Sequence, residues 1–308
     1  MLLKGIFKEA HPIIQLIFLL AITFAGALIF SFIGVAWIFF KSGFSIEMMT
    51  EITTNIADYP DYARELQFFS QLGTFIFPAL LAAYLFSDNY KEYLQLDTPF
   101  NWPVILWTIV SMLVAIPFLN CVTYFNQQVV FPEALSGLEE LLKRMEEENA
   151  RFMESILYTD NTMAFIFNIL IIAVFAGVGE EFMFRGVLQN IFGRIIRNKH
   201  ILIWTIAVIF SAIHFQFYGF VTRALLGAYL GYLIYYTKNM WVPVLAHFTN
   251  NFVSVVLFRV YQDKPLEMEE LDTIGYGSTW WLSVASVALF VFAFWQIKKR
   301  SVSQDFAS

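Results

Sequence analysis

The sequence has little charge and almost no cysteine. Charged residues make up 14% of its 308 residues, against about 25% in an average soluble domain. The net charge is −6, and because no basic stripe is present to neutralise phosphates, we exclude nucleic acid as a partner. Cys121 is the single cysteine, which excludes an intrachain disulfide and a zinc site built on several thiolates.

The chain is rich in long apolar runs. Hydrophobic residues make up 58% of it, 35 of them phenylalanine, and the mean hydropathy is +0.62. Apolar runs of about 18 residues or more predict spanning helices. We therefore predict an all-α, polytopic helical membrane protein with about eight transmembrane helices, at residues 13–39, 66–86, 103–123, 162–182, 200–217, 219–237, 240–260 and 279–297.

The spans and the polar stretches between them suggest three segments. Residues 1–160 hold three N-terminal membrane helices and an acidic amphipathic connector, and residues 161–260 hold the polar motifs of a core. Residues 261–308 hold an acidic loop and a C-terminal transmembrane helix. The connector, about 126–161, reads as a solvated helix lying on the membrane, with a substrate lid as the alternative.

Basic residues indicate the orientation of the chain. An even number of spans places both termini on one side, and the positive-inside rule favours the cytoplasm for the ends. We predict a multi-pass protein of the plasma (inner) membrane with both termini cytoplasmic. Basic residues near the ends are Lys4, Lys8, Lys298, Lys299 and Arg300. Those expected on the other side are Lys41, Arg64, Lys143, Arg144, Arg151, Arg259 and Lys264.

Two adjacent glutamates close the fourth apolar run. Glu181 and Arg185 are spaced i, i+4 in the acid-first order that favours an ion pair on one helix face. Glu180 lies about 100° round the helix from Glu181, off the arginine's face. A charge in mid-bilayer costs roughly 2.5–3.5 kcal/mol, so these residues are functional candidates. The alternative is that both glutamates only balance Arg185 or face solvent.

Two further polar motifs follow inside apolar runs. His214 ends the sequence Phe210-Ser-Ala-Ile-His214, and His247 and Asn251 are spaced i, i+4 on another span. An imidazole and an amide could both donate hydrogen bonds to a developing oxyanion. Alone, each residue could equally be a satisfied core group or a polar contact between helices.

The three motifs together resemble the CPBP family of intramembrane proteases, which includes the type II CAAX prenyl endopeptidases and the bacterial abortive infection membrane proteins. The family pattern is EExxxR, then FxxxH, then HxxxN on successive helices. It stands here as Glu180-Glu181-x-x-x-Arg185, Phe210-x-x-x-His214 and His247-x-x-x-Asn251. The resemblance covers about residues 160–255.

The resemblance implies an endopeptidase that hydrolyses peptide bonds with an activated water. Glu180 would activate the water with help from His214, and His247 and Asn251 would stabilise the oxyanion. Glu181 and Arg185 would support the site through their ion pair. The implied partners are a peptide or membrane-protein substrate and the lipid bilayer, and the substrate's prenylation stays open.

The need for a metal also stays open. The chain has no H-E-x-x-H, and a catalytic zinc normally takes three strong protein ligands. A metal-free mechanism is favoured and no cofactor is expected. In the metal-dependent alternative, Glu180, His214 and His247 would hold zinc or another divalent ion.

Two other classes of function are alternatives to the protease. One is a non-proteolytic membrane immunity or scaffold protein, of the bacteriocin self-immunity type, that keeps the motifs for stability. The other is a transporter or channel with a proton path, for which inverted repeats would be expected and none is visible. A serine protease site of the rhomboid kind is absent from the sequence, as is a pair of intramembrane aspartates.

Overall fold

The computed structural model describes residues 3–305, with side chains described for residues 3–301. Every regular element within the described residues is helical. Two compact units can be distinguished: unit 1 comprises Met1–Leu96 and Ala150–Arg197, and unit 2 comprises Asp97–Asn149 and Asn198–Ser308. The predicted division at residues 160 and 260 followed motifs rather than packing, and it stays a prediction.

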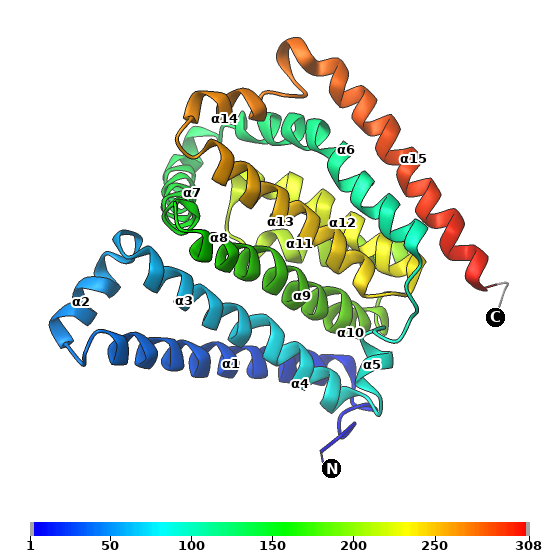
Figure 1. Ribbon diagram of the computed structural model, residues 1–308. Coiled ribbons are helices and arrows are strands. Elements are labelled where there is room, and N and C mark those ends of the chain that lie inside the picture. The colour runs from blue at the N-terminus through cyan, green and yellow to red at the C-terminus, as the bar shows by residue number, and fades with distance from the viewer. Residues whose placement is uncertain (1–2, 306–308) are drawn as a thin grey trace. The chain divides into compact units, whose positions relative to one another are not determined.

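Unit 1 is built on three long helices, which Figure 1 shows. The first is α1 (Pro12–Lys41), and α2 (Ile46–Thr54) follows it. The second runs through α3 (Pro60–Gln71), a π-helical turn (Leu72–Ile76) and α4 (Phe77–Phe86), and packs along α1. The third contains α8 (Thr162–Asn168), α9 (Ala176–Glu181) and α10 (Gln189–Gly193), joined by π-helical turns at Ile169–Phe175 and Phe182–Leu188. The short α5 (Tyr90–Tyr93) also belongs to this unit.

The sequence explains both the start and the exposure of α1. Pro12 occupies its first turn, where a missing N–H costs nothing, and the His11 ring accepts a hydrogen bond from the backbone of Ile13. Phe24, Leu28 and Phe32, spaced one turn apart on one face of α1, are 68%, 56% and 75% exposed. A contiguous exposed apolar face would be unfavourable in water, so this face suits contact with lipid.

A buried arginine links separate helices of unit 1 by hydrogen bonds. Arg64, on α3, is 3% exposed and donates to the backbone oxygens of Ile156 and Tyr158, at 2.7 and 3.2 Å from Nη2. Its Nε also donates to Oδ1 of the buried Asn168, at 3.0 Å. Arg64 was predicted to lie outside the second span. It instead lies inside the helix and supplies donors to the carbonyls that end α7 (Ser136–Leu157).

Two glycines let α1 and the second long helix approach each other closely. A Cβ built on Gly26 would lie 2.4 Å from the backbone oxygen of Gly73, and one built on Gly73 would lie 2.5 Å from Cβ of Phe30. Both distances are far inside van der Waals contact. Small residues are the usual means of close helix approach in membranes.

We expect Gly73→Ala to destabilise the protein by about 1–3 kcal/mol, because the added methyl group must push two backbones apart. Thermal unfolding in detergent would measure the effect. Gly137→Ala is the matched control, since a Cβ at Gly137 in α7 meets nothing within 4 Å and alanine favours helix. Equal melting temperatures for the two variants would contradict the close approach.

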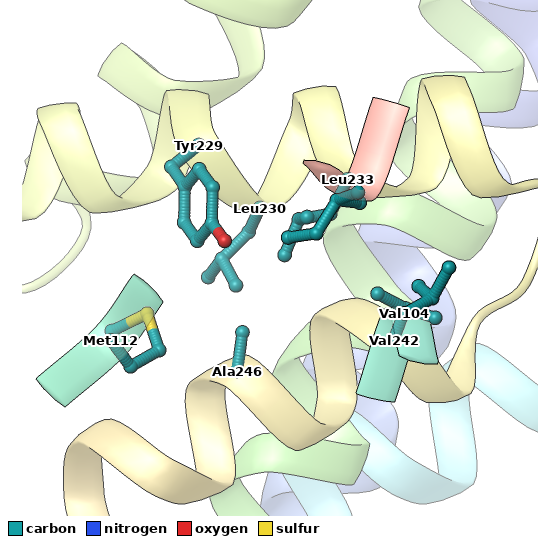
Figure 2. Close-up of a cluster of buried hydrophobic side chains, with 8 residues drawn as sticks. Val104, Met112, Tyr229, Leu230, Leu233, Val242 and Ala246 are labelled. Carbon is teal, nitrogen blue, oxygen red and sulfur yellow. The ribbon is translucent and has the colours of Figure 1, made fainter. Parts of the chain in front are cut away.

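Unit 2 contains α6 (Trp102–Gln127), α11 (Lys199–Ala212), α12 (Phe220–Thr237), α13 (Trp241–Tyr261), α14 (Pro265–Asp272) and α15 (Trp280–Asp305). Most of α7 also belongs to it. Helix α15 lies along α6, and α11 lies along α12 (Figure 1). A buried apolar cluster joins α6, α12, α13 and α15, and its members are Val104, Met112, Tyr229, Leu230, Leu233, Val242, Ala246 and Ile297 (Figure 2).

Helix α6 contains a proline beside its serine contacts with α15. Pro117 has no N–H, so the carbonyl of Leu113, four residues earlier, loses its helical donor. The hydroxyl of Ser283 lies 2.9 Å from the Pro117 oxygen and 2.6 Å from the Gly275 oxygen, and that of Ser286 donates to the Val114 oxygen at 2.5 Å. Serine hydroxyls of α15 therefore contact the backbone of α6 close to this lost bond, as polar side chains between membrane helices do.

Seven helices in the described part of the chain are long and apolar enough to cross a membrane. They confirm the predicted class, a polytopic helical membrane protein. The predicted span at 200–217 is the exception, because its helix is α11, with only 14 residues, about 21 Å at 1.5 Å per residue. The helix stops there because the backbone turns at Phe215, which has a φ of +52°. The predicted same-side termini require α11 to cross as well, and stay a prediction.

Candidate active site

Unit 1 contains the predicted carboxylate pair and its arginine. Arg185 Nη1 donates to Glu181 Oε1 at 2.9 Å, and both side chains are fully buried. Glu180 is 7% exposed. The i, i+4 ion pair expected from the sequence is thus present, and it engages the second glutamate of the motif. The roles assigned to these residues stay predictions.

The helix changes its geometry at this ion pair. Glu181 is the last residue of α9, and Arg185 lies in the π-helical turn Phe182–Leu188. Hydrogen bonds in such a turn run from i to i+5, and π turns are rare in helices and frequent at functional sites. The turn is fully buried up to Val187, so an irregular stretch of backbone lies in the interior directly after the two glutamates.

Gly179 brings the second long helix against the carboxylate pair. A Cβ built on Gly179 would lie 2.9 Å from Cγ1 of Ile76 and 3.0 Å from Cβ of Phe75. Both residues belong to the π-helical turn Leu72–Ile76, directly before α4 begins. The residue before Glu180 must therefore be small, which the sequence motif did not reveal.

Unit 2 contains the two predicted histidines, which meet at one phenylalanine. The ring of Phe210 lies 5.0 Å from the His214 ring and 6.0 Å from the His247 ring, centre to centre, with edge-on geometry in both cases. His247 is 8% exposed and His214 is half-buried. Both imidazole rings therefore contact Phe210, which the sequence identified only as part of a motif.

His214 was expected late in a helix, but it lies in the turn that follows α11. Its Nδ1 is 2.7 Å from the Phe210 backbone oxygen. Since a carbonyl oxygen only accepts, Nδ1 must carry the proton of this hydrogen bond. In the neutral ring the lone pair is then on Nε2, so the backbone fixes the tautomer that is suited to accept a proton there.

Asn251 has a neighbour that orients its amide. Asn250 Nδ2 donates to Asn251 Oδ1 at 3.1 Å. This contact occupies the acceptor end of the Asn251 amide, and thereby determines where its donor Nδ2 points. Asn251 and His247 are one turn apart on α13. Asn250 is a second residue that the sequence motif did not single out.

The acidic connector contacts the segment that follows His214. Within unit 2, the Phe131 ring lies 4.8 Å from the Phe217 ring, and the backbone N–H of Tyr218 donates to Glu146 at 3.1 Å. The helix predicted in the connector is present as α7. Leu138 and Leu141 on it are 45% and 42% exposed, as a helix lying on a membrane requires. Both readings of the connector stay predictions.

Neither unit by itself, within its described residues, groups three side chains that could hold a metal ion. Within the described residues no three His, Cys, Asp or Glu side chains are grouped so that they could hold an ion. In unit 2 the two histidines at Phe210 form a pair, whereas a catalytic zinc normally takes three protein ligands. We therefore derive no step that passes through a metal.

Comparison with known proteins agrees with the motifs. Residues 162–253 match the family described as type II CAAX prenyl endopeptidase Rce1-like, which confirms the predicted resemblance for this region. The chain is also 33% identical over 85 residues to the uncharacterized protein YpbD of Bacillus subtilis (strain 168), a match that covers 26% of this chain and 40% of that protein. The chain thus spans about two fifths of this relative. No solved structure matches the chain significantly.

Proposed function

We propose that this protein is an intramembrane endopeptidase of the CAAX protease type, which hydrolyses peptide bonds with a water activated by Glu180 and His214. The observation that carries the proposal is that the matched region, residues 162–253, includes all six polar residues of the three motifs. The buried ion pair of unit 1 and the shared phenylalanine of unit 2 support it, because both hold their side chains in fixed positions.

In this mechanism the water oxygen attacks the carbonyl carbon of the scissile bond while its proton passes to Glu180. His214, held in one tautomer by the Phe210 carbonyl, accepts a hydrogen bond from the same water at Nε2. The C–N bond then breaks, and the amine leaves with the proton that Glu180 returns. General base catalysis of this kind contributes roughly 10²–10⁴ to the rate.

His247 and Asn251 stabilise the negative charge that develops on the carbonyl oxygen. Both are donors on one face of α13, and the contact from Asn250 orients the amide. Glu181 and Arg185 keep the helix around Glu180 in place by their ion pair. The substrate is a peptide or a membrane protein, reached from within the plasma membrane, with both ends of the enzyme in the cytoplasm.

The test is a cleavage assay on the full-length protein purified in detergent, against a panel of prenylated and unprenylated peptides. Cleavage that persists in a strong chelator is the expected result. Loss of cleavage in chelator, with recovery on adding zinc, would replace the proposed mechanism by a metal-dependent one. If no peptide is cleaved under any condition, the proposed activity is wrong and an immunity or scaffold role takes its place.

We expect Asn251→Ala to lower kcat about 10²- to 10³-fold, as the loss of one oxyanion donor does elsewhere. Asn250→Ala should lower it less, because the donor is still present but no longer oriented. The KM for the peptide should change little in both variants. A large rise in KM with an unchanged kcat would assign Asn251 to substrate binding instead.

A further inference from the structure

Three lysines from separate elements of unit 2 converge on two tyrosines at the end of α12. The ammonium groups of Lys199 and Lys238 lie 4.8 and 4.9 Å from the centre of the Tyr235 ring. That of Lys298, on α15, lies 5.0 Å from the centre of the Tyr236 ring. The two tyrosine rings are themselves 5.1 Å apart. We call these five residues the lysine–tyrosine cluster.

Within residues 3–301, no acidic side chain forms an ion pair with the lysines of this cluster. All three lysines are exposed. The stretches 198–200, 237–241 and 296–300 contain no Asp or Glu. Cation–π contacts at exposed sites are worth only about 0.5–1 kcal/mol, so the cluster can still bind an anion.

An apolar cavity of about 200 Å³ lies between α6, α11, α12 and α15, also within unit 2. At roughly 30 Å³ for a group the size of a water molecule, it has room for a segment of a hydrocarbon chain but not for a whole lipid. The hydroxyl of Tyr229, a lining residue on α12, is hydrogen-bonded to Ser111 on α6 at 2.5 Å. Large apolar and aromatic side chains line the cavity, among them Phe118, Trp204, Leu225, Tyr232 and Phe294.

Tyr232 and Phe294 connect the cavity with the cluster. The Tyr232 ring lines the cavity, and its hydroxyl is 2.7 Å from Nδ1 of His200, the residue after Lys199. Phe294 also lines the cavity, and its ring lies 5.8 Å from the Tyr236 ring. A cationic surface therefore adjoins an apolar pocket. A phospholipid needs the first for its phosphate and the second for its acyl chain.

We propose that unit 2 binds one anionic glycerophospholipid, with its phosphate at the lysine–tyrosine cluster and part of one acyl chain in the cavity. Lysines and tyrosines near helix ends also serve as general interfacial anchors. That role requires neither convergence on shared rings nor an adjoining cavity. Basic pockets between transmembrane helices on the cytoplasmic side are known to take anionic headgroups, and the predicted orientation places this cluster on that side.

Native mass spectrometry of the full-length protein with phosphatidylglycerol, and with phosphatidylcholine of the same chain length, tests the proposal. We expect one phosphatidylglycerol to bind at least about tenfold more tightly than phosphatidylcholine. The triple variant Lys199→Gln/Lys238→Gln/Lys298→Gln should lose about 10- to 100-fold in affinity for phosphatidylglycerol. The substituted side chains are exposed, so the fold should be unaffected.

The matched control is Lys41→Gln/Lys143→Gln/Lys264→Gln, which removes the same charge from lysines that are paired with Glu65, Glu139 and Glu267. It should bind phosphatidylglycerol like the unaltered protein. Equal loss in both triple variants would overturn the proposal in favour of a general charge effect, as would equal binding of the two lipids. Glycerol 3-phosphate and dihexanoyl phosphatidylglycerol test the cavity. Both should bind more weakly than the long-chain lipid, and equal affinity would refute a bound acyl chain.

Discussion

Glu180→Gln is expected to lower kcat for peptide cleavage by about 10²–10⁴, the range for loss of a general base. Glutamine has nearly the same shape as glutamate but cannot accept the proton of the attacking water. Glu180 is 7% exposed, and the neighbouring Glu181 makes a salt bridge to Arg185. The substitution leaves both members of this salt bridge in place, so the fold should be kept. Steady-state kinetics beside a thermal unfolding curve would measure both properties.

Two comparisons make this experiment specific. Glu154→Gln removes a carboxylate from an exposed position on α7, and it should cleave at the full rate. Glu181→Gln alters the glutamate that holds the arginine, and it should lose stability as well as activity. If Glu180→Gln kept its activity while Glu181→Gln lost activity with the fold intact, the two roles would have to be exchanged. A protein that acts only by binding would be indifferent to Glu180→Gln.

Arg185→Met is expected to lower the free energy of unfolding by about 3–5 kcal/mol. The guanidinium and the Glu181 carboxylate are both fully buried and lie 2.9 Å apart. Removing one member of a buried pair leaves the other charge without its compensation, which costs that much in other proteins. Methionine keeps most of the volume, so the loss would reflect charge rather than a cavity. Denaturation in mixed micelles would give the free energy.

The double variant Glu181→Gln/Arg185→Met should recover much of this loss. Replacing both members of a buried ion pair is often close to neutral for stability, because neither member is left behind without the other. A double variant as unstable as Arg185→Met alone would show that the arginine acts through other contacts. Peptide cleavage by the stable double variant would then tell whether the pair is needed for chemistry or only for folding.

Sequence patterns predicted the structural features that depend on residues close together in the chain. The ion pair of Glu181 with Arg185 follows from i, i+4 spacing on one helix, and it is present. The long spans follow from hydropathy, and seven helices satisfy the length and composition of a membrane span. The short α11 shows where this reasoning ends, because apolar residues continue past Ala212 while the backbone turns at Phe215.

Contacts between distant residues could not be derived from the pattern. Arg64 was assigned to a loop by its charge, yet its partner Ile156 is 92 residues away. The meeting of His214 and His247 at Phe210 likewise depends on how the helices of unit 2 pack. The three π-helical turns carry no simple periodic signature either, although one of them contains Arg185.

The serine contacts between α15 and α6 have a consequence for biosynthesis. The hydroxyls that contact the Pro117 and Val114 oxygens belong to Ser283 and Ser286 on α15, and Ser283 is synthesised 166 residues after Pro117. During synthesis, α6 is therefore made long before these hydroxyls exist. Helix α15 is the last long helix of unit 2 to be made, and its packing along α6 completes the unit.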